Sequence, residues 1–354
     1  YLAAGFSPLE VMEFDDEGVI AGLERGLAAG GHTVVRVGRG LELARRLAGG
    51  ERWDLVFNIA EGLRGRGREA QVPAVCELYD QPYTFSDPVT CGVTLDKAWA
   101  KRVVRDAGLP TAPFALVRSA EEARSVDLEP PLFVKPLAEG SSKGVTRRSL
   151  VVRREELEPC CQELLADFGD GLLGESYQPG REVTVGVVGA GRSARPRGVM
   201  EVSYSRRAES RAYTAQNKDR YLANVRYRLL RRGPLQRRAS DLAGAAYRAL
   251  ECRDAARVDL RCDLAGVPNF LEVNPLPGLH PVRSDLPIMA RLGGMAYEQL
   301  LAEIVDEAAA RYGLSAHGPA VTWCGALEVA VGGASPDPLG ATWSPPSPLA
   351  GLVD

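Results

Sequence analysis

RVDLRCDLAGVPNFLEVNPLPG, residues 257–278, is the stretch of sequence that decides the fold. Its apolar runs predict strands over 256–262 and 269–273, and the segment 264–268, which contains glycine and proline, predicts the turn of a hairpin. Because side chains alternate between the two faces of a strand, polar residues that lie two apart project from the same face. The stretch therefore predicts an antiparallel hairpin with one polar face.

Four polar side chains share that face. Arg257 and Asp259 come from the first strand, and Glu272 and Asn274 come from the second. Carboxylate and amide oxygens at this spacing suit Mg²⁺, which commonly bridges substrate phosphates. The proline-rich turn that follows can aim the backbone N–H of Gly278 at an oxygen on which negative charge builds. A surface hairpin with a salt bridge is the alternative interpretation.

A second element, upstream, combines a lysine with a loop of small residues. A strand predicted over 132–135 delivers Lys135, and the loop Glu139-Gly-Ser141-Ser-Lys-Gly144 follows it. Backbone N–H groups in such a loop can wrap a polyphosphate, with the lysine as a point charge. The order of residues is not that of a Walker loop. An ordinary hairpin is the alternative.

A third element lies between two further predicted strands, over 172–177 and 183–188. Glu175 lies near the end of the first strand, beside Tyr177, and Glu182 directly precedes the second. A nucleotide base and its ribose could each meet one of these carboxylates, while the strand end supplies backbone donors and acceptors. The alternative is a pair of exposed charges at strand ends.

Helices and strands alternate at the start of the chain. Apolar spacing predicts a helix over 14–27, strands over 33–37 and 55–59, and a helix over 41–47 between these strands. This alternation is typical of a parallel, doubly wound α/β layer. We expect its first strand around or before residues 1–6, with the start of the chain truncated.

The remaining sequence divides into two lobes and a tail. A proline-rich connector at 109–113 follows the helix that starts at Lys97, and we place the first boundary just before that helix. The last segment is rich in Gly, Pro, Ala and Ser without a sustained period, which predicts disorder. The predicted parts are an N-terminal domain at 1–95, a central lobe at 96–177, a C-terminal lobe at 178–314 and a disordered tail at 315–354.

Composition limits the classes of partner. Of the 354 residues 45% are hydrophobic, which is enough for a full core, and the net charge of −3 provides no basic field for nucleic acid or an anionic membrane. The sequence shows neither an apolar run of spanning length nor a secretion leader, so we expect a cytoplasmic protein that acts on small molecules. The seven scattered cysteines are interpreted as reduced and mostly buried.

Together and in this order, Lys97, the Val-Lys135-Pro lysine, the Glu-Gly-Ser-Ser loop and the hairpin of 257–278 resemble the ATP-grasp core of D-alanine:D-alanine ligase. The resemblance covers roughly residues 53–311. It implies an α/β ATP-grasp fold of three lobes, in which an N-terminal doubly wound domain precedes two α+β lobes that sandwich ATP. It also implies an ATP-dependent ligase that joins a carboxylate to an amine through an acyl phosphate.

The resemblance assigns a role to each candidate residue, with ATP and two Mg²⁺ (or Mn²⁺) as cofactors. The nucleotide is expected to meet Lys97, Lys135, Ser141, Glu175, Tyr177, Glu182 and, in a mobile lid at 213–221, Lys218. The metal ligands are Asp259, Glu272 and Asn274. Arg257 and the N–H of Gly278 stabilise the tetrahedral intermediate, and Ser284 meets the carboxylate of the acceptor.

The sequence departs from the family where the donor should bind. Asp15 stands in the altered opening, Glu61 occupies the expected histidine position, and an acidic stretch is replaced by one that contains Arg68. Three interpretations follow: a D-alanine:D-alanine ligase for cell-wall synthesis, a ligase for another amino acid or a peptide, and an ATP-binding module without turnover. A homodimer is a further option for the assembly.

Overall fold

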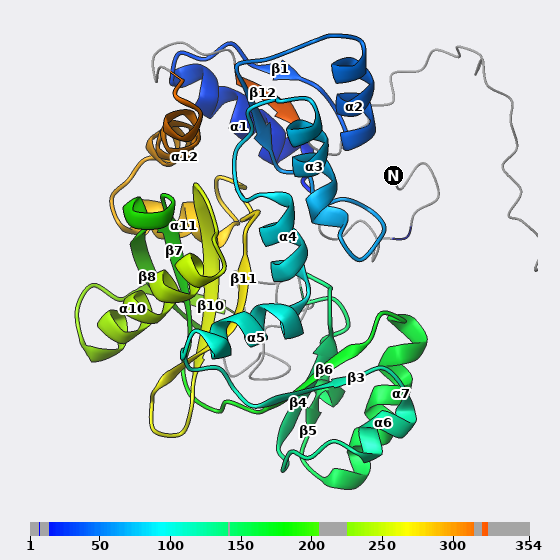
Figure 1. The fold of residues 1–354 in the computed structure, drawn as a ribbon. Helices are drawn as coiled ribbons and strands as arrows, with labels where there is room; N and C mark the ends of the chain where they lie inside the picture. The colour runs from blue at the N-terminus through cyan, green and yellow to red at the C-terminus, as the bar shows by residue number, and fades with distance from the viewer. Residues whose placement is uncertain (1–6, 8–13, 141, 205–224, 315–320, 325–354) are drawn as a thin grey trace, which may run out of the picture.

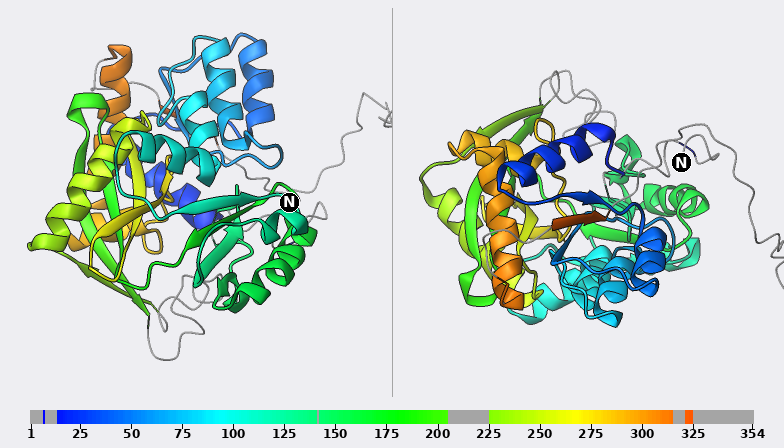
Figure 2. Two further views of the ribbon diagram at one scale, coloured as in Figure 1. Left: turned by 60° about the horizontal axis from the view of Figure 1, so that its bottom comes forward. Right: turned by 90° about the horizontal axis from the view of Figure 1, so that it is seen from above.

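The computed structural model describes residues 7, 14–140, 142–204 and 225–314, and the backbone of residues 321–324. Three sheets organise these residues: a parallel sheet of three strands and two antiparallel sheets of four and five strands. Figure 1 shows them as an N-terminal domain above a C-terminal and a central lobe, and Figure 2 shows the same parts from two further sides. The predicted α/β architecture of three lobes is confirmed.

The N-terminal domain is the expected alternating layer. α1 begins where a carboxylate oxygen of Asp16 accepts the N–H of Val19 at 3.1 Å, and its apolar face, including Leu23 and Leu27, is buried. Helices and strands alternate as far as β2, and three helical elements then lead to the first predicted boundary. The elements are α1 (Glu17–Ala29), β1 (Val35–Arg36), α2 (Gly40–Ala48), β2 (Leu55–Asn58), the 3₁₀ helix η2 (Arg68–Ala70), α3 (Gln71–Leu78) and α4 (Pro88–Leu95).

A strand from the C-terminal segment completes this sheet. β12 (Val321–Cys324) pairs in parallel with both β1 and β2 and lies between them. The prediction of a disordered tail is therefore wrong for these four residues. Their sequence, Val-Thr-Trp-Cys, is β-branched and aromatic, a composition that favours strands. Because the sequence around these four residues is rich in Gly and Pro, the composition of the whole segment predicts disorder although these four residues favour a strand.

The central lobe is a four-stranded antiparallel sheet with two helices. Its elements are β3 (Phe114–Val117), α6 (Ala120–Arg124), β4 (Leu132–Pro136), η3 (Arg147–Ser149), β5 (Leu150–Val151), η4 (Arg154–Glu156), α7 (Leu157–Asp167) and β6 (Leu172–Ser176). The strand order is β3-β6-β4-β5. Val134 of the sheet and Leu157 of α7 belong to one buried core, so the helices cover one face of the sheet.

The C-terminal lobe holds the five-stranded sheet. Its elements are β7 (Glu182–Val188), η5 (Gly191–Ser193), β8 (Arg195–Tyr204), β9 (Val225–Leu229), α10 (Pro234–Ala249), β10 (Ala255–Cys262), β11 (Pro268–Asn274), α11 (Asp285–Leu292) and α12 (Tyr297–Tyr312). The strand order is β11-β10-β7-β8-β9. α10 covers one face through Tyr247, which shares a buried core with Val185 and Val258.

Helix α5 (Lys97–Asp106) joins the two lobes. Its buried residues Ala100 and Val104 pack in the core of the C-terminal lobe, next to Phe270 of β11. Its N-terminus is capped by Asp96, which accepts the N–H groups of two following residues at 3.0 Å. α5 thereby presents its first turn to the space between the lobes. The boundary at 95 and 96 stays a prediction.

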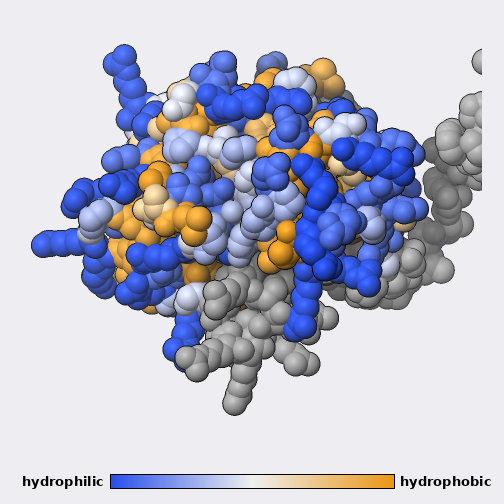
Figure 3. All heavy atoms as spheres, turned by 90° about the horizontal axis from the view of Figure 1, so that it is seen from below, coloured by the Kyte–Doolittle hydropathy of each residue, from blue (hydrophilic) through white to orange (hydrophobic). Residues whose placement is uncertain are grey.

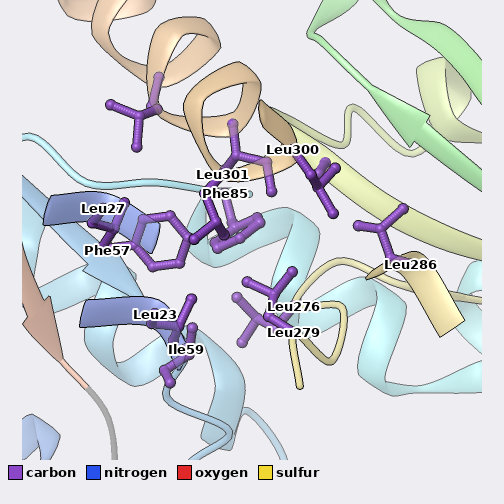
Figure 4. Packing of buried hydrophobic residues seen from close by; sticks show 14 of the residues in the cluster. Leu23, Leu27, Phe57, Ile59, Phe85, Leu276, Leu279, Leu286, Leu300 and Leu301 are labelled. Carbon is purple, nitrogen blue, oxygen red and sulfur yellow. The ribbon is translucent and has the colours of Figure 1, made fainter. Parts of the chain in front are cut away.

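A shared hydrophobic cluster fastens the N-terminal domain to the C-terminal lobe. Figure 4 shows Leu23 of α1, Phe57 of β2, Leu276 of the turn after β11 and Leu301 of α12 converging in it. A buried ion pair adds to this contact, because Asp254 accepts bonds from Phe85 N at 2.6 Å and from an Arg311 Nη at 2.7 Å. The domain is therefore docked by apolar and ionic contacts together.

The surface carries both hydrophilic and hydrophobic residues. Seen from below, hydrophobic residues are scattered among hydrophilic ones (Figure 3). None of the helices in the described ranges is long and apolar enough to span a membrane. The six cysteines whose side chains the structure describes are buried and free, as expected, and burial raises the pKa of their thiols.

Candidate active site

A cavity lies where the central and C-terminal lobes face each other. Predicted site residues from four separate segments converge on it, and so do several residues that the sequence did not single out. Its charged and hydroxyl-bearing lining includes Lys97, Lys135, Glu139, Ser142, Lys143, Glu182, Thr184, Arg257, Asp259, Arg261, Glu272 and Asp285.

The structure gives the register of the hairpin of β10 and β11. Arg257 lies opposite Asn274, and Asp259 lies opposite Glu272, on neighbouring antiparallel strands. Cβ atoms of directly opposed residues are about 5 Å apart, so one small cation can reach both carboxylates. The predicted strands and turn of the hairpin are confirmed.

The pKa values of the two carboxylates of the hairpin are shifted in opposite directions. Burial raises the pKa of Asp259 and outweighs Arg257, and the neighbouring charge of Glu272 raises it further. Burial acts in the same direction on Glu272, but Lys97, Lys135 and Arg257 together lower its pKa below the usual range. A divalent cation beside Asp259 would favour its ionised form and so oppose this rise in its pKa. The carboxylate oxygens of Asp259 and Glu272 are hard donors of the kind that Mg²⁺ prefers. Asn274 lies opposite Arg257 in the hairpin but is not part of the cavity lining.

Two lysines lie above Glu272. Lys97 Nζ is 3.6 Å from Glu272 Oε2, and Lys135 Nζ is 3.8 Å from the same atom. Lys97 also donates to the carbonyl of Glu139 at 2.6 Å, which ties α5 to the loop after β4. Both ammonium groups therefore lie on the side of the cavity where a polyphosphate would meet the metal ligands.

Glu175 is placed differently from the expectation. It is 3% exposed and is not part of the cavity lining. Its carboxylate lies 2.8 Å from Lys101 Nζ and 3.0 Å from Lys135 Nζ. Burial would raise the pKa of Glu175, but the two lysines outweigh it and hold the pKa at about 2. Glu175 thus positions Lys135 from beneath the cavity.

Sequence reasoning missed Lys101. This lysine is fully buried, burial lowers its pKa, and it donates to Phe270 O at 3.2 Å as well as facing Glu175. A signal was available, because Lys101 follows Lys97 by four residues on one helix, and such residues lie on the same face. The sequence alone offered no reason to place that face against a carboxylate.

The loop after β4 is compact on the side that the structure describes. Gly144 has φ +72°, and a Cβ there would come within 2.6 Å of Pro136, so only glycine fits this turn. Lys143, another residue that the sequence did not single out, lines the cavity and lies 3.2 Å from Glu139. Ser141 lies outside the described residues.

The region expected to hold the nucleoside contains a linked set of polar and aromatic groups. Glu182 lines the cavity and accepts a bond from Arg261 at 3.3 Å. Arg261 also donates to the Tyr177 hydroxyl at 3.1 Å and lies over its ring. Tyr177 stacks on Phe133, which lines the cavity. Phe133 therefore presents an aromatic ring to the cavity on the same side as the Glu182 carboxylate's partner Arg261, while Tyr177 packs behind Phe133 and does not itself line the cavity.

Gly278 and Ser284, which were predicted to meet the tetrahedral intermediate and the acceptor carboxylate, lie close together. A Cβ on Gly278 would be 2.9 Å from Ser284 Oγ, which accepts the N–H of His280 at 2.9 Å. Arg257 is held by Asp259 through bonds of 2.9 and 3.1 Å, and the two carboxylates beside it raise the pKa of its guanidinium against the effect of burial. Lys218 and the predicted lid at 213–221 lie outside the described residues.

The three residues predicted to contact the donor do not line the cavity. Asp15 lies beside α1, and burial, followed by the charge of Asp16, raises its pKa to about 7 against the opposing charge of Arg283. Glu61 is half-buried in the loop before η2. Arg68 is buried and donates to the carbonyl of Ala138 at 2.8 Å, so its guanidinium supports the start of the loop after β4.

Arg68→Met is expected to weaken ATP binding. The change removes a charge-assisted bond that fixes the start of the loop after β4, and such a bond is worth about 1.5–3 kcal/mol. We expect the KM for ATP to rise roughly tenfold or more, with a smaller loss in kcat. Steady-state kinetics measure both. Arg45→Gln, on the outer face of α2, is the control, and equal kinetics for the two variants would contradict the assignment.

Comparisons with known proteins agree with this geometry. A family model described as "D-ala D-ala ligase C-terminus" matches residues 103–306. An uncharacterized protein y4sG from Sinorhizobium fredii is 34% identical over 262 residues, covering 73% of this chain and 75% of its own. A D-alanine–D-alanine ligase of Methylobacterium radiotolerans is 33% identical over 286 residues, covering 78% and 88%.

Solved structures show the same fold. D-alanine–D-alanine ligase from Bacillus anthracis, complexed with ATP, superimposes with a TM-score of 0.60 at 23% identity and covers 78% of this chain and 84% of its own. VanG D-Ala:D-Ser ligase from Enterococcus faecalis gives a TM-score of 0.59 at 26% identity, covering 72% and 73%.

Proposed function

Because the chain belongs to the D-alanine–D-alanine ligase family of ATP-grasp enzymes, we propose that it joins the carboxylate of one D-amino acid to the amine of another at the expense of ATP. The observation that carries the proposal is the pairing of Asp259 with Glu272 across the hairpin, beneath Lys97 and Lys135. These are the charges that a phosphoryl transfer from ATP to a carboxylate requires. D-alanine is the first donor to test.

Each group has a part in the two steps. Asp259, Glu272 and Asn274 would hold two Mg²⁺ ions, which neutralise phosphate charge when bound. Lys97 and Lys135 hold the transferred phosphate, and Glu175 keeps Lys135 in place. Glu182 meets the ribose, and Phe133, backed by Tyr177, forms a wall for the base.

In the second step the acceptor amine attacks the acyl phosphate. Arg257 and the N–H of Gly278 meet the oxyanion that forms, while Ser284 receives the carboxylate of the acceptor. Ser141 and Lys218, from segments outside the described residues, are proposed to cover the phosphates and exclude water. The cytoplasm, which supplies ATP, is the proposed compartment.

A second candidate is a ligase for another amino acid or a small peptide. The observation that favours it lies in the donor region, where Arg68 is committed to the loop after β4 and Asp15 has a pKa of about 7. A half-protonated carboxyl group holds an ammonium less firmly than a full carboxylate does. In this candidate function the donor has a different side chain and is recognised by other contacts than in the relatives.

The test is phosphate release from ATP and Mg²⁺ with single amino acids and with pairs, followed by mass spectrometry of the products. Release with D-alanine alone, with a dipeptide as product, supports D-alanine as both substrates. Release only with other amino acids or with mixtures supports the second candidate. ATP binding without release under any of these conditions would overturn both and leave a binding module.

A further inference from the structure

Asp285 is an ionisable residue of the cavity to which neither the metal site nor the phosphate site gives a role. It is the first residue of α11 and directly follows Ser284, the helix N-cap. Its side chain is 11% exposed, and it lines the cavity together with Arg257 and Asp259. One carboxylate oxygen, Oδ2, lies 3.3 Å from Arg257 Nη1.

Arg257 does not need this carboxylate to stay in place. Asp259 already accepts bonds from Nε at 3.1 Å and from Nη2 at 2.9 Å, whereas the bond to Asp285 is longer. The other oxygen of Asp285, Oδ1, is buried and has no hydrogen-bond partner among the residues that the structure describes. A buried carboxylate oxygen without a donor is costly, so a donor from a bound molecule would stabilise it.

The position of Asp285 indicates which group of a bound molecule would donate a hydrogen bond to its Oδ1. Arg257 and Gly278 are the groups proposed to meet the carbonyl oxygen under attack, and Ser284 Oγ lies next to Gly278. The attacking nitrogen must therefore arrive close to Arg257. Amino acids carry that nitrogen as an ammonium at neutral pH, and the guanidinium alone would repel it. A carboxylate beside the guanidinium reverses this repulsion.

We propose that Asp285 binds the ammonium group of the acceptor and takes its proton as the new bond forms. The proposal rests on the proposed function. The ammonium gives one proton to Asp285, and the freed lone pair forms the C–N bond to the acyl phosphate carbon. The carbonyl π electrons move to oxygen and then return, the C–O bond to phosphate breaks, and the second nitrogen-bound proton leaves with the phosphate.

The acceptor is accordingly a molecule with a free primary ammonium next to a carboxylate, with the carboxylate directed to Ser284. In this proposal Asp285 selects acceptors that carry an ammonium group, and it takes no part in binding the nucleotide. Its loss should therefore affect the second step far more than the first.

Hydroxylamine separates the two steps, because it is neutral at neutral pH and captures an acyl phosphate as a hydroxamate without an acceptor ammonium. Wild type, Asp285→Asn and Asp285→Ser are incubated with ATP, Mg²⁺ and the amino acids found active with wild type. We expect peptide formation to fall about 100-fold in both variants, while hydroxamate formation falls less than about threefold. Asp306→Asn, on the exposed side of α12, is the control.

Parallel loss of peptide and hydroxamate, or unchanged peptide formation, would overturn the role of Asp285. Thermal melting shows whether each variant is folded, and the isosteric asparagine and the smaller serine must agree. If wild type forms neither hydroxamate nor peptide with any amino acid, the proposed function itself fails, and the role of Asp285 fails with it. That result is distinct from a failure confined to the variants.

Discussion

Glu272→Gln is expected to lower turnover about a thousandfold. The neutral amide removes one of the two carboxylates that face each other across the hairpin, and the metal contribution to phosphoryl transfer is worth several kcal/mol, of which about 4 corresponds to this factor. Lys97 and Lys135 also lose the carboxylate that lies within 4 Å of both. Phosphate release with the active amino acids measures the loss.

Two comparisons make that result specific. Glu298→Gln, the same exchange on the exposed first turn of α12, should leave turnover within twofold of wild type. Nucleotide affinity without metal should change little or increase, because the two lysines are then free for phosphate. Full activity in Glu272→Gln would refute the metal assignment, and a matching loss in Glu298→Gln would show that the effect is not local.

Glu175→Gln is expected to reduce the free energy of unfolding by about 3–5 kcal/mol at neutral pH. The carboxylate is buried between Lys101 and Lys135, at 2.8 and 3.0 Å. Its loss removes the carboxylate nearest to both buried ammonium groups and leaves Lys135 with the more distant Glu272, at 3.8 Å. Denaturant titration measures the difference. Glu158→Gln, which removes a solvent-screened partner of Arg124, is the matched control and should leave the free energy of unfolding nearly unchanged.

The pH dependence of this difference has a definite sign. The folded-state pKa of Glu175 is about 2, below its ordinary value of 4.5, so ionisation is favoured by folding. The contribution is present above about pH 4.5 and is lost as the pH falls towards 2. Wild type and Glu175→Gln should therefore converge in acid. A difference that stays constant with pH would show that the carboxylate is not ionised in the fold.

Local patterns in the sequence predicted much of this molecule. The strands and the turn of the hairpin of 257–278 were predicted, because side-chain alternation and a turn that contains glycine and proline are local properties, whereas its register comes from the structure. The positions of Lys97 and Lys135 beside Glu272 followed from the resemblance to the family and agree with the distances found.

Properties that depend on distant contacts could not be read from the sequence. The burial of Glu175 depends on Lys101, which is brought to it by a helix packed on another lobe. The role of Arg68 depends on Ala138, seventy residues away. Asp285 looks in sequence like an ordinary first-turn acid of a helix, and only the cavity distinguishes it.

The hydrophobic cluster of Figure 4 has a consequence for how the chain can be divided. Its members come from near both ends of the described chain, including Leu23, Phe57, Leu276 and Leu301. A proteolytic cut at the predicted boundary near residue 95 would leave each fragment with an uncovered apolar surface. We therefore expect the N-terminal domain and the two lobes to unfold together, and neither fragment to persist as an isolated module.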